Sequence, residues 1–136
     1  MDAAQALADL TEISSQIEAA VLFDREGAVQ GSTLADGVAA RALATAAGTL
    51  LEGAAGFRAG GGELRQLEAS TREGSVFVVC DGARRIAAIT GPDPTAGLVF
   101  YDLKSCLRGA AADEPKPRRR RRAPLESGGE TSDVEA

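Results

Sequence analysis

The chain has 136 residues, of which 44% are apolar and only 4% are aromatic, enough for one folded domain with a core of small aliphatic side chains. Histidine, the commonest general base and metal ligand, is absent and no acidic pair stands out, so we expect no enzyme activity, metal or cofactor. Residues 1–108 hold 9 basic and 14 acidic residues, which argues against nucleic acid as a partner of this part.

The start of the sequence does not have the pattern of a secretory signal. It has no basic segment and carries Asp2 and Asp9. No apolar run approaches the roughly 20 residues that a membrane-spanning helix needs. We therefore expect a cytoplasmic protein, in which Cys80 and Cys106, both within apolar segments, are buried and reduced.

The first predicted element is a helix that Asp2 caps and that ends near residue 15. Its apolar positions, Leu7, Leu10 and Ile13, recur every three residues and form one stripe. The opposite side carries acidic residues. The helix should therefore lie on the rest of the domain with one side in water.

A β-hairpin is predicted next. Residues 18–24 are apolar at both sets of alternate positions, which indicates a strand whose two faces are both covered, and hence helices on both faces of the sheet. The following turn contains Gly27, which can adopt a positive φ. Residues 28–33 return as the second strand.

Residues 34–55 are predicted to form a long helix that is rich in alanine, with Asp36 near its start. Gly48 costs up to about 1 kcal/mol relative to alanine inside a helix. Close approach of another backbone would explain this glycine, and so would the general bias toward small residues. The exposed side includes Arg41, Thr45 and Glu52. The apolar seam comprises Ala39, Leu43, Ala46, Leu50 and Ala54.

Three more strands are predicted. Residues 63–71 alternate between polar and apolar positions, which is typical of an edge or interface strand that needs covering. Residues 75–81 form a continuous apolar run and are the best candidate for a central strand. Residues 84–90 begin with Arg84 and Arg85, which can receive an acidic partner or a phosphate, or can form an ordinary solvated strand end.

A last helix is predicted from about residue 94 to residues 108–109, and residues 109–136 are predicted to be a disordered tail. The tail contains five consecutive arginines, which can bind an anionic membrane surface at about 1 kcal/mol per residue, bind another acidic partner, or stay solvated. They are Arg118, Arg119, Arg120, Arg121 and Arg122.

The α-β-β-α-β-β-β-α order resembles the roadblock/LC7 family over about residues 3–108. The resemblance rests on Leu7–Ile13, the hairpin at 19–27, the helix after Asp36, the stretch Gly74–Val79 and the closing helix after Pro94. It implies an α/β (α+β) fold with a five-stranded antiparallel sheet and helices on both faces. It also implies a homodimer or a heterodimer in which the third strands pair across a two-fold axis and the second helices pack side by side.

For function, the resemblance implies a non-catalytic dimeric regulator or scaffold of a small Ras-like GTPase in a bacterial signalling or polarity module. Arg41, Thr45 and Glu52 would then lie on the partner-binding surface. One alternative is a structural adaptor without a GTPase. Another is a small-molecule sensor of the profilin or PAS plan, which needs a cavity with convergent polar groups that a small aliphatic core does not favour. The predicted dimer interface contains Ala39, Ala40, Leu43, Ala47, Leu50, Leu67, Ala69 and Thr71.

Overall fold

Three helices and a five-stranded sheet make up the fold. The structure, a computed structural model, describes residues 2–57 and 63–111. Every pair of neighbouring strands is antiparallel, and the strand order across the sheet is β2-β1-β5-β4-β3, which confirms the predicted fold class. The elements are α1 (Ala3–Ile13), β1 (Ile17–Asp24), β2 (Val29–Ser32), α2 (Gly37–Ala55), β3 (Gln66–Ser70), β4 (Ser75–Asp81), β5 (Arg84–Thr90) and α3 (Ala96–Ala111).

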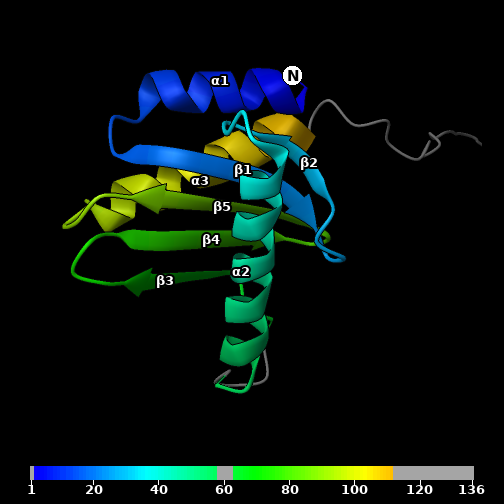
Figure 1. Cartoon of the computed structure of the whole chain (residues 1–136), viewed down its shortest axis with the longest axis vertical. Helices are drawn as coiled ribbons and strands as arrows, with labels where there is room; N and C mark the ends of the chain where they lie inside the picture. The colour runs from blue at the N-terminus through cyan, green and yellow to red at the C-terminus, as the bar shows by residue number, and fades with distance from the viewer. Residues whose placement is uncertain (1, 58–62, 112–136) are drawn as a thin grey trace, which may run out of the picture.

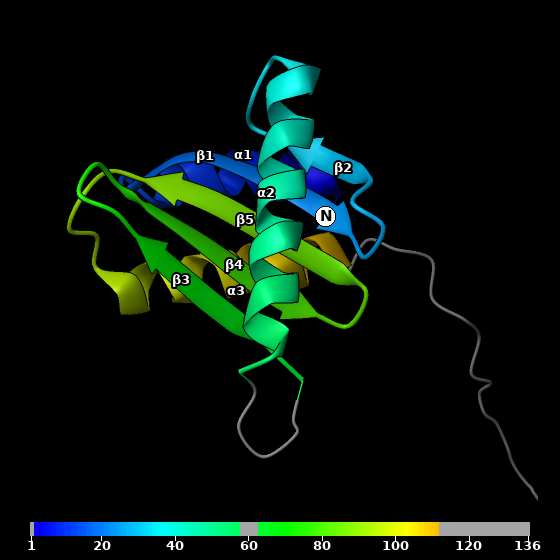
Figure 2. The same ribbon diagram turned by 60° about the horizontal axis from the view of Figure 1, so that its bottom comes forward.

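The helices form two layers, one on each face of the sheet (Figure 1). Helices α1 and α3 pack together on one face, where Leu10, Phe77 and Leu103 belong to the same apolar cluster. Helix α2 crosses the other face over a second cluster that contains Phe23 and Val78. Figure 2 shows the sheet lying between these layers. The prediction of helices on both faces is therefore confirmed.

Strand β1 explains why both faces need a helix. Val21, Leu22 and Phe23 are three consecutive residues that point alternately to the two faces, and each is at most 1% exposed. A strand whose side chains are apolar on both faces cannot leave either face of the sheet in contact with solvent. Both helical layers are therefore required to bury this one strand.

Several predicted boundaries and burial assignments need correction. Ile13 is 69% exposed, because α1 ends there and the chain turns into extended backbone at Ser14. Strand β4 lies in the interior of the sheet between β5 and β3, which confirms its prediction as a central strand, and β5 is the middle one of the five. Helix α3 extends to Ala111, beyond the predicted end at residues 108–109. The five arginines at 118–122, with most of the predicted tail, lie outside the described residues.

The side of α2 that packs on the sheet was predicted only in part. Of the expected seam, Leu43 is buried, whereas Ala46 is exposed. Relative to the prediction, the helix is rotated about its axis. The sequence could not fix this rotation, because small apolar residues occur on almost all sides of the helix and several stripes fit the pattern equally well. The residues buried against the sheet are Ala40, Leu43, Ala44, Ala47 and Leu51.

The turn between β1 and β2 is held rigidly, as its sequence predicts. The carboxylate Oδ1 of Asp24 accepts hydrogen bonds from the backbone N–H groups of Glu26 and Ala28, at 3.0 and 2.9 Å. Gly27 has a φ of 87°, in the left-handed region that favours glycine. The neighbouring residue Arg25 is therefore carried on a fixed turn. None of the three described helices is long and apolar enough to cross a membrane.

Two glycines offer a matched test of packing in this fold. A Cβ atom on Gly74 would collide with the backbone carbonyl of Thr90, whereas one on Gly48 would meet no atom within 4 Å. We expect Gly74→Ala to lower the free energy of unfolding by about 1–3 kcal/mol, a typical cost of overpacking. We expect Gly48→Ala to raise it by about 0.5–1 kcal/mol, because alanine is the better helix former. Urea unfolding of both variants measures the two shifts, and a destabilising Gly48→Ala would contradict the open space at that position.

Candidate functional site

Helix α2 covers only part of its face of the sheet. A helix with its side chains is about 10–12 Å wide, while strands of seven or eight residues are about 25 Å long. Figures 1 and 2 show α2 running across the strands rather than along them. Each side of α2 therefore borders a part of the sheet face that the helix leaves uncovered, and the two sides differ in chemistry.

One side of α2, which we call the apolar flank, consists of Ala39, Ala46 and Leu50. Ala46 is exposed and the other two are half-buried. The opposite side of α2 borders the end of the sheet where β4 ends and β5 begins. The apolar flank therefore borders the other end, where β4 begins and β5 ends. On that sheet end Val76 and Ile89 are only half-buried, although both are apolar. The apolar flank and these two sheet residues form a surface without a cover among the described residues.

Strand β3 continues this surface to the edge of the sheet. It pairs only with β4 among the described strands, which confirms the predicted edge position. Leu67 and Ala69 are half-buried on the α2 side of the strand, and Thr71, just beyond its end, is exposed. An unpaired strand edge beside an apolar surface favours pairing with another chain.

Some of the residues predicted for the dimer interface are used inside the protomer. Ala40, Leu43 and Ala47 pack against the sheet and are at most 7% exposed. They hold α2 in place, and any partner would touch them little. The predicted interface residues left at the surface are Ala39, Leu50, Leu67, Ala69 and Thr71.

The other side of α2, which we call the polar flank, consists of Arg41, Thr45 and Glu52. All three are exposed, as predicted. They follow one another along the helix at intervals of four and seven residues, so they form a single stripe. The structure therefore presents them together to solvent on one continuous surface.

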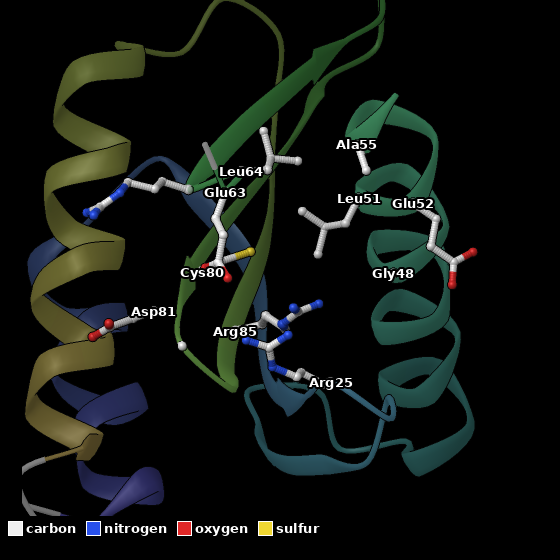
Figure 3. Close-up of a pocket in the computed structure, with 12 residues that line it drawn as sticks. Arg25, Gly48, Leu51, Glu52, Ala55, Glu63, Leu64, Cys80, Asp81 and Arg85 are labelled. Atoms are coloured by element: carbon white, nitrogen blue, oxygen red, sulfur yellow. The ribbon is translucent and has the colours of Figure 1, made fainter. Parts of the chain in front are cut away.

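Beyond the polar flank, a cavity of about 670 Å³ opens between the end of α2 and the end of the sheet. Figure 3 shows side chains from both elements facing it. The apolar wall contains Leu51 of α2 and Leu64, and the polar wall contains Arg25 and Arg85. The sequence argued against a cavity with convergent polar groups, and the structure has an open cavity here that apolar and polar side chains both line.

Arg85 is the least expected residue of the cavity. It lies on β5, opposite Phe23 of β1 and Cys80 of β4, on the face that α2 covers. The residue is half-buried, and its Nε atom is buried without a hydrogen-bond partner among the described residues. Arg85 is therefore not the solvated strand end that such an arginine pair commonly forms. Arg84, its neighbour, points to the other face by strand alternation.

Arg25 and Arg85 act on the same thiol. Burial raises the pKa of Cys80 above its usual value, and the positive charges of Arg85 and Arg25 oppose this shift. The carboxylate of Glu63 adds to the rise in pKa. Cys80 is half-buried rather than buried as predicted, so its sulfur faces the cavity (Figure 3).

Cys106 has the buried environment that the sequence predicts. Its Sγ lies 3.4 Å from the carbonyl oxygen of Ala6, to which it donates a weak hydrogen bond between α3 and α1. Burial raises its pKa to about 11. This thiol therefore stays protonated at neutral pH and serves packing.

No protein-family model and no curated protein matches the sequence. Solved structures do match, beginning with a roadblock/LC7 domain from Streptomyces avermitilis, which has 20% identity and a TM-score of 0.73 over 82% of this chain and 97% of that one. A structure titled "MglB with tetrameric arrangement" has 14% identity and a TM-score of 0.70 over 81% and 85% of the two chains. The gliding protein MglB from Thermus thermophilus has 14% identity and a TM-score of 0.68 over 81% and 86%. The chain has the roadblock/LC7 fold.

The two thiols should differ in reactivity. We expect the disulfide reagent DTNB to modify Cys80 at least about tenfold faster than Cys106 in the folded protein, because Cys80 lines the cavity whereas Cys106 is buried. A raised pKa means that the thiolate, the reactive form, keeps increasing above pH 9, so the Cys80 rate should rise through that range. Cys80→Ser and Cys106→Ser assign the two phases. Equal rates for both thiols would contradict the placement of Cys80.

Proposed function

We propose that this chain is a non-catalytic, dimeric regulator or scaffold of a small Ras-like GTPase. The observation that carries the proposal is the division of α2 into two exposed sides within a roadblock/LC7 fold. The apolar flank and the β3 edge suit a second copy of the chain, and the polar flank suits a separate partner. Such a regulator acts by holding the switch loops of the GTPase in one arrangement, which is a shift of populations and needs no catalytic group.

Self-association is supported by what the protomer leaves uncovered. The apolar flank, Val76, Ile89 and the edge of β3 adjoin one another, and C2 pairing is the commonest way for identical surfaces to cover each other. Pairing of two β3 edges would make one sheet from two. Small residues on the apolar flank would let two α2 helices approach closely.

The polar flank supports a second partner. In a dimer built on the apolar flank, the stripes of Arg41, Thr45 and Glu52 remain in solvent, because they lie on the opposite sides of the helices. A surface that carries both charge signs fits a partner protein better than it fits a uniformly anionic membrane. We also propose that the arginine block at 118–122 binds an anionic membrane surface or another acidic partner. This attraction would add to the affinity of the polar flank for its partner. We place the protein in the cytoplasm.

A charge on the apolar flank should break the dimer. Leu50→Asp places a carboxylate where an apolar interface forms, so we expect the dimer dissociation constant to rise at least about a hundredfold. Light scattering of the full chain over a concentration series measures this shift. Thr45→Asp, which adds the same charge to the polar flank, is the control and should leave the dissociation constant within about threefold of the parent value. Equal losses in both variants would contradict the assignment of the flanks.

A charge reversal on the polar flank should weaken GTPase binding without affecting the dimer. We expect Arg41→Glu to weaken binding of a small Ras-like GTPase encoded beside this chain by about tenfold or more, because it reverses a rim charge. Titration calorimetry with the GTPase in its GDP-bound and GTP-analogue-bound forms measures the effect. Arg72→Glu, in the turn between β3 and β4, is the matched control. If the parent chain dimerises but binds no such GTPase in either form, the adaptor alternative replaces the proposal.

A further inference from the structure

We propose that the cavity between α2 and the sheet end binds a small molecule through a phosphate group, which Arg25 and Arg85 hold between them. The proposed dimer does not use this cavity, and the polar flank proposed for the GTPase borders it only through Glu52. The proposal starts from Arg85, whose Nε is buried without a hydrogen-bond partner among the described residues. A guanidinium is always charged, and a buried charged donor without an acceptor is costly. Arg85 also lines the cavity, so an oxyanion there would face its guanidinium and compensate the positive charge, while Nε itself stays covered by the protein.

The second guanidinium comes from a separate, rigid element. Arg25 stands on the hairpin turn that Asp24 fixes, and both arginines line the cavity and act on the thiol of Cys80. In Figure 3 the two side chains enter the cavity from the same end. Two positive charges held near each other repel, so the arrangement favours a ligand with a double negative charge. A phosphate monoester carries such a charge near neutral pH, and its oxygens match the planar donor fork of arginine.

The size and the remaining walls of the cavity indicate more than a free ion. A volume of about 670 Å³ lies within the range of about 300–1,000 Å³ typical of small-molecule sites. Leu51 and Leu64 supply an apolar wall, and Gly48 leaves space beside α2. A ligand with a phosphate at one end and an apolar or planar body at the other would fill this space.

Three acidic residues line the same cavity and bear on the proposal. In Figure 3 the carboxylates of Glu52 and Asp81 point away from the two arginines, whereas that of Glu63 lies near the thiol of Cys80. None of the three comes within ion-pair distance of Arg25 or Arg85 in the described part of the chain, and the arginines therefore keep their charge available. Glu63 is the one carboxylate that a bound phosphate must face, so its removal should strengthen binding.

Titration calorimetry of the full chain with inorganic phosphate and with adenosine monophosphate tests the proposal. In every chain the arginines at 118–122 are replaced by serine, so that phosphate bound by the tail does not contribute. We expect saturable binding of both probes, with adenosine monophosphate the tighter because its body contacts the apolar wall. Arg85→Gln and Arg25→Gln should each weaken binding about tenfold or more, since each removes charge-assisted hydrogen bonds. Glu63→Gln should strengthen binding of both probes. Arg72→Gln and Glu73→Gln make the same charge changes outside the cavity, and they should leave the affinity for both probes unchanged.

Three results would overturn the proposal. The first is no saturable binding of either probe by the parent chain. The second is an equal loss in the Arg72→Gln control, which would reduce the effect to general charge screening. The third is binding of acetate as tight as that of phosphate, which would point to a carboxylate of a protein partner. Arg25 is exposed on a turn, so its replacement keeps the test valid even if Arg85→Gln does not fold.

Discussion

The structure depends on one constraint: the central strands are apolar on both faces, and only one helix is available for one of those faces. Val21 and Phe23 on β1 and Ala87 on β5 must be buried on the side of α2, and they lie near the middle of the strands. Helix α2 crosses the sheet there and buries them. A helix of ordinary width cannot also cover both strand ends, so the same packing that completes the core leaves two open surfaces.

The two open surfaces have different chemistry because different residues happen to occupy the two strand ends. At one end the sheet carries Val76 and Ile89 beside the apolar flank, so contact with a second apolar surface stabilises it. At the other end the sheet carries Cys80 and Arg85, which leave an amphipathic cavity. In our account self-association uses the first end, and ligand binding uses the second. The polar flank lies between the cavity and solvent, so an occupied cavity would adjoin the surface proposed for the GTPase.

Most of the fold could be predicted from the sequence because its signals are local. The apolar run of β1 predicts two covered faces, Asp2 and Asp36 cap their helices, and Gly27 closes the first hairpin. The alternation of polar and apolar residues at 66–70 is also a local signal, and it predicts an edge strand. The seam of α2 could not be fixed, since small apolar residues surround that helix and only the tertiary contacts select Ala40 and Ala47 over Ala46.

The cavity was harder to predict because its walls come from segments far apart in the sequence. Arg85 looks like an ordinary strand end until β1 and β4 are placed on either side of it, with α2 above. The one available signal was the alternation along the strand, which places Arg85 on the same face as the apolar residues Ala87 and Ile89. That phase indicates a guanidinium directed at the core side of the sheet, and Arg25 joins it only through the fold of the hairpin.

The central claim is that a second copy of the chain covers the apolar flank and the β3 edge. Hydrogen–deuterium exchange of the full chain at high and at low concentration tests it most directly. By the register with β4, the backbone N–H groups of Gln66, Glu68 and Ser70 point away from the sheet. We expect these amides to exchange slowly at high concentration and faster on dilution. Fast exchange at every concentration would contradict it.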